Sequence, residues 1–248
     1  MHGLVLIGLA ATLATALCAR DPLPPEAARA LPADILLLGE QHDATRHPGL
    51  HRDTVQALAR QGRLAALALE MADQGASTAG LAPEADEAAV RAALGWEPGA
   101  QGGWPWEPYA PAVMAAVRAG VPVLGANLPR ARMREALADT SLDEGLPPEV
   151  LARQREAVRA GHCDLLPPAQ VGPMARVQVA RDRAMAQTVA QAARAGQTVV
   201  LLAGSAHADP DNGVPLHVPA GLAARSVAWP AEATGRDYCA ELRRQMGR

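Results

Sequence analysis

Four short apolar runs are spaced along the chain, each followed by glycine or polar residues. They cover residues 35–38, 64–69, 121–126 and 198–203. Apolar runs of this length are too short for buried helices and are typical of strands covered on both faces. Longer stretches with helical periodicity lie between them. This alternation predicts an α/β fold with a mainly parallel sheet flanked by helices.

Helical periodicity is found in residues 51–61, 83–94, 110–119, 129–138, 148–160 and 174–195. Pro167 and Pro168 follow the fifth stretch and mark its end. Residues 83–94 and the loop after them are predicted to form an insertion behind the second strand. Residues 213–218 and 226–229 are predicted to be short edge strands, because their prolines would interrupt a central one.

Polar side chains follow each apolar run at the point where the predicted strand ends. Glu40 and His42 follow the first run, Glu70 the second, Asn127 the third and His207 the fourth. A glycine three residues before each histidine lets the backbone turn sharply. Because ligands bind at the carboxyl edge of an open parallel sheet, we expect these five side chains to meet at one edge.

Length, composition and charge limit the classes of function. The chain has 248 residues, 49% of them hydrophobic, which is enough for the core of one domain or of one domain with an inserted lobe. Its net charge is −3 and its pI is near 6.2. No basic surface for nucleic acid is indicated by these values, so nucleic acid is not an expected partner.

Aromatic residues are concentrated in residues 95–109. The whole chain has four tryptophans, two tyrosines and no phenylalanine, and this segment contains Trp96, Trp104, Trp106 and Tyr109. Glycine and proline around these rings predict a loop. The rings either cap the core or form a platform for a flat apolar ligand.

The N-terminus carries an apolar run over residues 3–17, followed by Cys18. This length suits a signal peptide better than a membrane-spanning helix, although a plain apolar tail is the alternative. Cys18 also allows a lipoprotein signal, but Leu17 stands where a small residue is expected. We therefore predict a signal peptide over 1–19, a linker with at most one helical turn over 20–32 and an α/β domain over 33–248.

Two further cysteines, Cys163 and Cys239, lie far apart in the sequence. In an exported protein they would form a disulfide that ties the C-terminal tail to the middle of the chain. Two buried free thiols are the alternative. The chain has no Cys-x-x-Cys motif, so a zinc ribbon is not indicated.

Seven stretches form an ordered set of motifs: Leu37–Asp43, Ala68–Met71, Trp104–Tyr109, Gly125–Arg130, Gly161–Cys163, Ala180–Met185 and Ala203–Pro215. Together they resemble the ChaN-like proteins, a bacterial haem-binding uptake family grouped with the Tiki and erythromycin-esterase-like proteins. The resemblance spans roughly residues 34–243. It implies a haem-binding protein of iron uptake, located in the periplasm or anchored to the outer membrane as a lipoprotein.

The same resemblance implies haem as the cofactor, a homodimer with the porphyrins near its interface, and an outer-membrane haem receptor as partner. Tyrosine and histidine are common haem ligands, and the only tyrosines of the chain are Tyr109 and Tyr238. Tyr109 is the predicted axial ligand because it lies in the aromatic loop. Trp104 and Trp106 are predicted to bind the cofactor beside it.

A second function follows from the resemblance to Tiki-like proteins, which are described as metal-dependent proteases with two Gly-x-x-His motifs and a glutamate. His42, His207 and Glu70 match this pattern and are the predicted ligands of a divalent metal. Together with Glu40 as general base, they would be the catalytic residues of a protease-like or esterase-like hydrolase. The alternative is that these groups hydrogen-bond one another and fix the strand ends.

His47 and His51 form another histidine pair, spaced four residues apart. The two side chains would share a face if a helix began early. Pro48 between them favours a turn around His47 instead, so a metal site at this pair is the weaker interpretation.

Overall fold

The computed structural model describes residues 22–96 and 103–247. The predicted signal peptide over 1–19 and Cys18 lie outside the described residues. The elements follow in the order α1 (Pro25–Ala30), β1 (Ile35–Glu40), α2 (His47–Arg60), β2 (Leu64–Asp73), α3 (Glu87–Ala93), α4 (Ala110–Arg118), β3 (Val123–Asn127), α5 (Arg130–Ala138), α6 (Ser141–Glu144), α7 (Pro148–Gly161), α8 (Pro168–Ala192), β4 (Thr198–Gly204), η1 (Val214–His217), β5 (Ala224–Ala228) and α9 (Tyr238–Gln245).

The strands form a parallel sheet in the order β3-β2-β4-β1-β5. Leu37 of β1 is paired with Leu201 of β4 and with Ser226 of β5. The two strands that end in Gly-x-x-His motifs are therefore neighbours, and β2 lies on the other side of β4. The predicted α/β fold with a mainly parallel sheet is confirmed.

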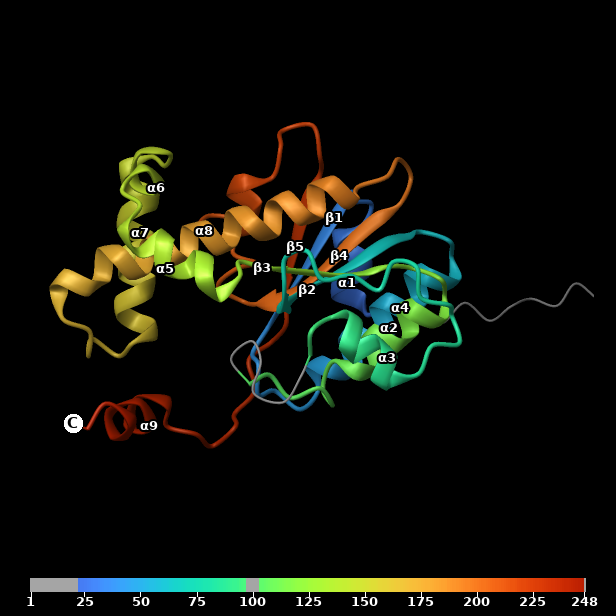
Figure 1. Cartoon of the computed structure of the whole chain (residues 1–248), viewed down its shortest axis with the longest axis horizontal. Coiled ribbons are helices and arrows are strands. Elements are labelled where there is room, and N and C mark those ends of the chain that lie inside the picture. The colour runs from blue at the N-terminus through green and yellow to red at the C-terminus, as the bar shows by residue number, and fades with distance from the viewer. Residues whose placement is uncertain (1–21, 97–102, 248) are drawn as a thin grey trace, which may run out of the picture.

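Helices cover both faces of the sheet (Figure 1). On one face, α2 and α4 pack over Leu36 and Leu38 together with the aromatic loop. On the other face, α8 packs over Ile35 and Leu37. Because successive side chains of a strand point to opposite faces, the unbroken apolar run of β1 supplies both cores.

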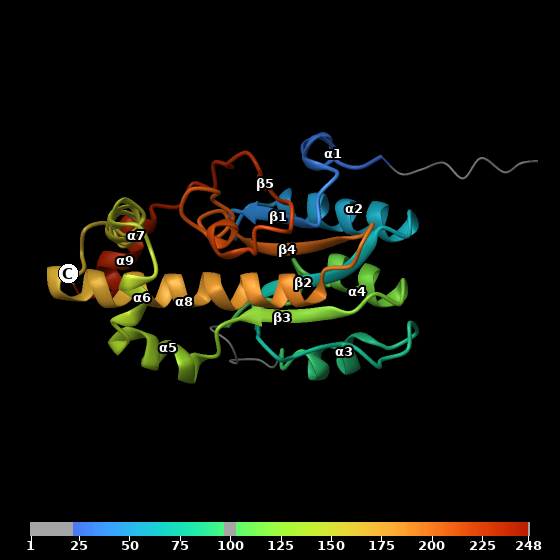
Figure 2. The same ribbon diagram turned by 90° about the horizontal axis from the view of Figure 1, so that it is seen from above.

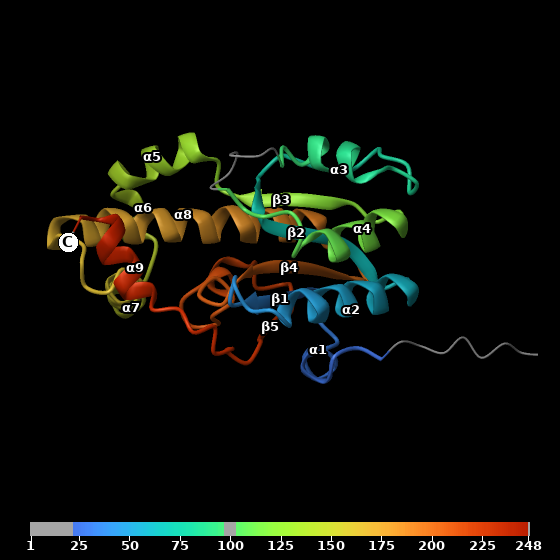
Figure 3. The same cartoon turned by 90° about the horizontal axis from the view of Figure 1, so that it is seen from below.

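The longest helix, α8, has 25 residues and begins at Pro168, six residues before the predicted start at Met174. A proline at the first position of a helix loses no hydrogen bond, because that N–H has no partner within the helix. Pro167 and Pro168 therefore begin α8, in addition to closing the segment after α7. Figures 2 and 3 show α8 running past the end of the sheet, where α5, α6 and α7 gather around it.

Two segments differ from their predicted form. Residues 213–218, predicted as an edge strand, contain the 3₁₀ helix η1 (Val214–His217). Gly213 lies so near the His207 carbonyl oxygen that a Cβ on this residue would be 2.3 Å from that oxygen. Pro215 has no backbone N–H to donate to a neighbouring strand. The predicted linker contains α1, whose Ala27 is fully buried in the core.

The described part of the chain, residues 22–96 and 103–247, contains no helix that is both long enough and apolar enough to cross a lipid bilayer.

Gly125 allows β3 to approach β2, and its replacement tests this packing. A Cβ at this position would stand 2.0 Å from the Asp73 carbonyl oxygen. We expect Gly125→Ala to lower the free energy of unfolding by about 1–3 kcal/mol in urea titrations. Gly49→Ala is the control, because a Cβ there meets nothing within 4 Å and alanine favours a helix by up to about 1 kcal/mol. Equal destabilisation by the two substitutions would contradict this account.

Candidate functional site

Polar side chains from four strand ends and from α8 meet at the carboxyl edge of the sheet. We call this set the rim; it consists of Glu40, His42, Glu70, Asn127, Arg181, Asp182 and His207. All five edge residues expected from the sequence belong to it. Two carboxylates organise the rim, one at the end of β1 and one in β2.

Glu40 is the first of these carboxylates, and it is only 4% exposed. The Tyr109 hydroxyl donates to its Oε1 at 2.6 Å, and the His42 Nδ1 donates to the same oxygen at 2.7 Å. Burial, together with the negative charge of Glu40, raises the pKa of Tyr109 above its ordinary value. Tyr109 therefore stays protonated and serves as a hydrogen-bond donor to the strand end.

His42 is the most accessible histidine of the rim, with 37% of its side chain exposed. Its ring packs against Trp104 with 4.6 Å between ring centroids. The Nε2 atom stands over Gly204, where a Cβ would be only 2.8 Å from it. Burial lowers the pKa of His42, but the hydrogen bond to Glu40 and the charge of Glu70 outweigh burial, so the net shift is upward.

Glu70, the second carboxylate, is 2% exposed and ties three elements together. Its Oε2 accepts a hydrogen bond from the Gly204 N–H at 2.7 Å, and its Oε1 pairs with the Arg181 guanidinium. Arg181 in turn donates to the Asn127 Oδ1 at 2.9 Å. Burial raises the pKa of Glu70, but the charges of His207 and Arg181 outweigh it and lower the pKa to about 2. Glu70 is therefore a buried anion whose charge is compensated.

His207 lies against a carboxylate in the same way as His42. Its Nδ1 is 2.6 Å from the Asp182 Oδ1, and its Nε2 is 3.6 Å from the Glu70 Oε1. Burial raises the pKa of Asp182 despite the neighbouring histidine. A carboxylate that binds Nδ1 fixes the orientation and the tautomer of the ring and directs Nε2 away from that carboxylate. Both rim histidines thus turn Nε2 towards the centre of the rim.

The predicted metal ligands, His42, Glu70 and His207, converge but are held by protein partners. Among residues 22–96 and 103–247, no group of three or more His, Cys, Asp or Glu side chains is placed to hold a metal ion. The Oε1 of Glu70 is already paired with the Arg181 guanidinium. The arrangement is a hydrogen-bonded network of the kind expected from the alternative interpretation, and the metal role stays a prediction.

Sequence reasoning missed the roles of Arg181 and Asp182, although both lie in one of the seven motifs. An Arg-Asp pair in the middle of a helix is most often an exposed ion pair. The only available signal was its position, since α8 crosses the sheet edge beside Glu70 of β2 and His207 of the loop after β4.

The interpretation of the other histidine pair needs correction. Helix α2 begins at His47, with Pro48 at its second position, so His47 is part of the helix. Its Nδ1 accepts from the Gln41 N–H at 3.1 Å, and its Nε2 donates to the Pro230 carbonyl oxygen at 3.1 Å. His51 is buried, 3.3 Å from Glu40 but without a hydrogen bond to it. Because both ring nitrogens of His47 already have partners, the pair has a structural role here.

Three of the four aromatic side chains of residues 95–109 belong to the core; residues 97–102 lie outside the described part. Trp96, Trp106 and Tyr109 are buried beside α4. Trp104 is half-buried, and its ring packs against His42 of the rim. The structure thus shows core capping for three of the four rings. The cofactor-binding roles of Trp104, Trp106 and Tyr109 stay predictions, and the Tyr109 hydroxyl is already engaged by Glu40.

The second tyrosine has the opposite environment. Tyr238 begins α9, is 47% exposed and donates from its hydroxyl to the Asp43 Oδ2 at 2.5 Å. The Arg236 guanidinium stands 5.3 Å from the centre of its ring. The neighbouring Cys239 forms the predicted disulfide with Cys163, which is confirmed.

Comparison with known proteins agrees with this geometry. A family model described as haem-binding uptake, Tiki superfamily, ChaN matches residues 27–218, which is well over half of the chain. The chain belongs to this family. It is similar to a solved structure described as cofacial heme binding to ChaN of Campylobacter jejuni, with a TM-score of 0.59 and 24% identity over 84% of each chain. At this identity the likeness establishes the ChaN fold. No curated protein matched the chain.

His51 provides a pH-dependent test of burial beneath the rim. Burial lowers its pKa from 6.5 to about 4, so protonation favours the unfolded state. The contribution of neutral His51 to the free energy of unfolding is complete above pH 6.5 and is lost as the pH falls towards 4. We expect His51→Leu to reduce this acid-induced loss in the free energy of unfolding by up to roughly 3 kcal/mol. Urea titrations between these two pH values measure it, with His162→Leu as control. Identical pH profiles for His51→Leu and the unsubstituted chain would contradict the prediction.

Proposed function

We propose that this protein binds haem for bacterial haem or iron uptake and does so outside the cytoplasm. Membership of the haem-binding uptake family supports the ligand. The disulfide between Cys163 and Cys239 supports export, because such bonds persist in oxidising compartments. The proposed location is the periplasm or, with a lipid on Cys18, the outer membrane. The proposed partners are a second copy of the chain and an outer-membrane haem receptor.

The observation that carries the proposal is the exposed phenol of Tyr238. Iron(III) binds the phenolate form of tyrosine, so a ligand must lose its proton and reach the metal. Tyr109 meets neither condition well, since it is 2% exposed and its pKa is raised by burial and by Glu40. Tyr238 is 47% exposed, and its hydroxyl is hydrogen-bonded to Asp43 and Thr234 at the surface. We therefore propose Tyr238 as the axial ligand in place of Tyr109.

Cations around Tyr238 suit the carboxylates of haem. Arg236 stands beside the ring, and Arg243 and Arg244 are exposed in the last turn of α9. Guanidinium groups pair with carboxylates through two parallel hydrogen bonds. The short exposed helix thus offers an iron ligand together with the guanidinium groups of Arg243 and Arg244 as partners for two propionates.

Titration of the full chain with haemin tests this function. We expect a saturable Soret band for the unsubstituted protein and at least about a tenfold weaker Kd for Tyr238→Phe. Tyr109→Phe is the matched control: it should keep the Soret spectrum but unfold at lower urea, because Glu40 loses a buried donor. The mass in size-exclusion chromatography, with and without haemin, tests the dimer. If Tyr109→Phe lost the Soret band and Tyr238→Phe kept it, Tyr109 would be the axial ligand.

The geometry of the rim favours a second candidate function, hydrolysis. His42 and His207 each have a carboxylate on Nδ1 and turn Nε2 towards Glu70. A metal-dependent reaction would require the cation to displace Arg181 from Glu70. In a metal-free reaction, the half-exposed His42 would remove a proton from water, and Arg181 would stabilise the oxyanion that develops.

A panel of peptidase and esterase substrates, combined with elemental analysis, tests this second function. We expect His42→Ala to lower any observed rate by about 10²–10⁴-fold, as for loss of a general base. Gly204→Ala should also lower it, because the new Cβ displaces the ring of His42. His162→Ala, which leaves the rim intact, is the control. A rate that is the same in His42→Ala as in the unsubstituted protein would exclude the rim as its source.

A further inference from the structure

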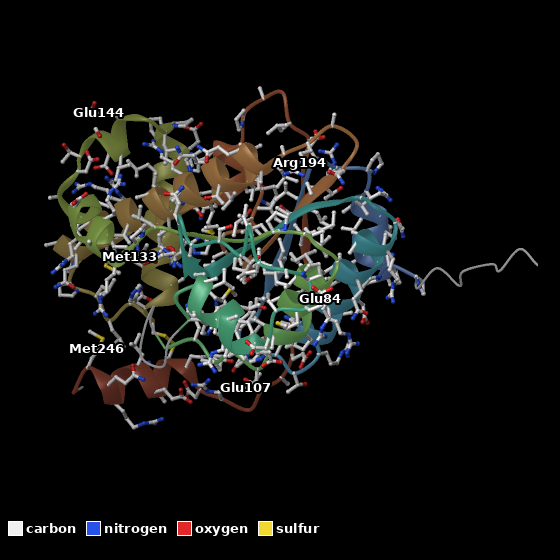
Figure 4. All side chains as sticks on the ribbon, turned by 45° about the vertical axis from the view of Figure 1, so that its right-hand side comes forward. Glu84, Glu107, Met133, Glu144, Arg194 and Met246 are labelled. Atoms are coloured by element: carbon white, nitrogen blue, oxygen red, sulfur yellow. A yellow bond between two sulfur atoms is a disulfide. The ribbon has the colours of Figure 1, made fainter. Side chains whose placement is uncertain are left out.

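The C-terminal helix α9 is held to the domain by surface contacts and one disulfide, without buried side chains of its own. After β5, residues 230–237 form a strap that leads to α9, which stands apart from the sheet (Figure 1). In Figure 4, Met246 marks α9 on the side of the molecule opposite Arg194, which follows α8. None of the side chains of α9 is buried. Its position therefore depends on a few surface contacts and on one covalent bond.

The strap is anchored to the loop between β1 and α2, which also carries the accessible histidine of the rim. The side chain of Gln41 exchanges two hydrogen bonds with the backbone of Glu232, at 3.0 and 3.1 Å. The Glu232 carboxylate accepts a hydrogen bond from the Thr45 N–H at 2.9 Å. Tyr238 adds its contact with Asp43. These contacts fix the strap but involve α9 only at its first residue.

The disulfide is the second anchor, and it holds the helix itself. Cys239 directly follows Tyr238 and is bonded to Cys163, with 5.6 Å between Cα atoms and a sequence separation of 76. Cys163 and Asp164 have φ values of 54° and 56°, in the left-handed region that non-glycine residues rarely adopt. Both cysteines are half-buried, so neither residue is enclosed in the core.

An eight-residue helix without buried side chains is not stable by itself, because isolated helices shorter than about 12–15 residues are marginal in water. Exposed ion pairs such as that between Arg236 and Glu241 add little, since solvent screens them. Once the disulfide is broken, α9 would leave its position and unfold. Tyr238 would then be held by its exposed contacts with Asp43, Thr234 and Gln41 and by the Arg236 guanidinium over its ring.

We propose that the Cys163–Cys239 disulfide is a redox switch that controls release of haem. The proposal rests on haem binding through Tyr238, as proposed above. In the oxidised form the disulfide keeps the phenol in place. A dithiol reductant attacks one sulfur to form a mixed disulfide, and its second thiol releases the other. Cys163 and Cys239 gain two electrons and two protons, the reductant becomes a disulfide, and the freed helix loses haem.

The expected loss of haem affinity on reduction follows from the fraction of molecules in which α9 stays docked. The apparent Kd of a ligand rises in inverse proportion to the fraction of protein in the binding-competent state. If the docked position of α9 falls to about one molecule in ten or fewer on reduction, haem affinity falls at least about tenfold. The dissociation rate should rise by a similar factor, because release no longer requires the helix to open against a covalent bond.

The test compares three forms of the full chain, all carrying Cys18→Ser so that only the two relevant cysteines remain. They are the oxidised protein, the same protein reduced with a phosphine, and the variant Cys163→Ser/Cys239→Ser. Haemin affinity is read from the Soret band, and the dissociation rate from transfer to excess apomyoglobin. We expect the reduced protein and the double variant to bind at least about tenfold more weakly than the oxidised protein, with no further effect of phosphine on the double variant.

Limited proteolysis gives a readout of α9 that does not depend on haem. Trypsin cleaves after arginine, and Arg236, Arg243 and Arg244 all lie in or beside α9. Cleavage there should be faster in the double variant, while the urea midpoint of the rest of the domain changes little. Tyr238→Phe in the oxidised protein should lose haem affinity and keep the slow cleavage.

The outcomes separate the two proposals. Absence of haem binding by the oxidised protein overturns the proposed function. Equal haem affinity of the oxidised protein and the double variant overturns the switch while haem binding stands. Equal cleavage rates of the two forms also overturn the switch, because α9 would then not depend on the disulfide.

Discussion

The buried carboxylate of Glu70 is the constraint on which the edge of the sheet depends. An ionised group that is 2% exposed must have its charge compensated, and the partners of Glu70 come from different elements. The Gly204 N–H fixes it to β4, Arg181 fixes it to α8, and His207 approaches from the loop after β4. Packing of α8 across the sheet edge is therefore set by electrostatics as well as by the apolar contacts beneath it.

The same constraint shapes the chemistry of the rim. With Glu70 paired to Arg181, the centre of the rim holds a balanced ion pair and not a free carboxylate. The histidines on either side are oriented by Glu40 and Asp182, which leaves both Nε2 atoms directed inwards. Such an arrangement suits proton transfer at the accessible His42. It also explains why three residues that match a metal motif can serve as a hydrogen-bonded network.

Burial separates the two tyrosines of the chain into different roles. Tyr109 packs in the core, and its hydroxyl donates a hydrogen bond to Glu40. It therefore stabilises the end of β1. Tyr238 is on a surface helix that the disulfide holds beside the loop after β1. The match to the ChaN family model covers residues 27–218, so Tyr238 and α9 lie beyond the matched region.

The apolar runs were sufficient to predict the parallel sheet and the meeting of Glu40, His42, Glu70, Asn127 and His207, because periodicity and chain direction are local properties of the sequence. The predicted end of the second strand at Leu69 was wrong, since β2 continues to Asp73. The starts of α2 and α8 were predicted too late, since a proline in the first turn can end one element or begin the next. Three contacts of the rim join residues that are far apart in the sequence. Arg181 pairs with Glu70 over 111 positions, Asp182 with His207 over 25, and Tyr109 with Glu40 over 69. Only the packing of α8 and the aromatic loop against the sheet decides such contacts, because burial and the position of a partner charge are properties of the folded chain.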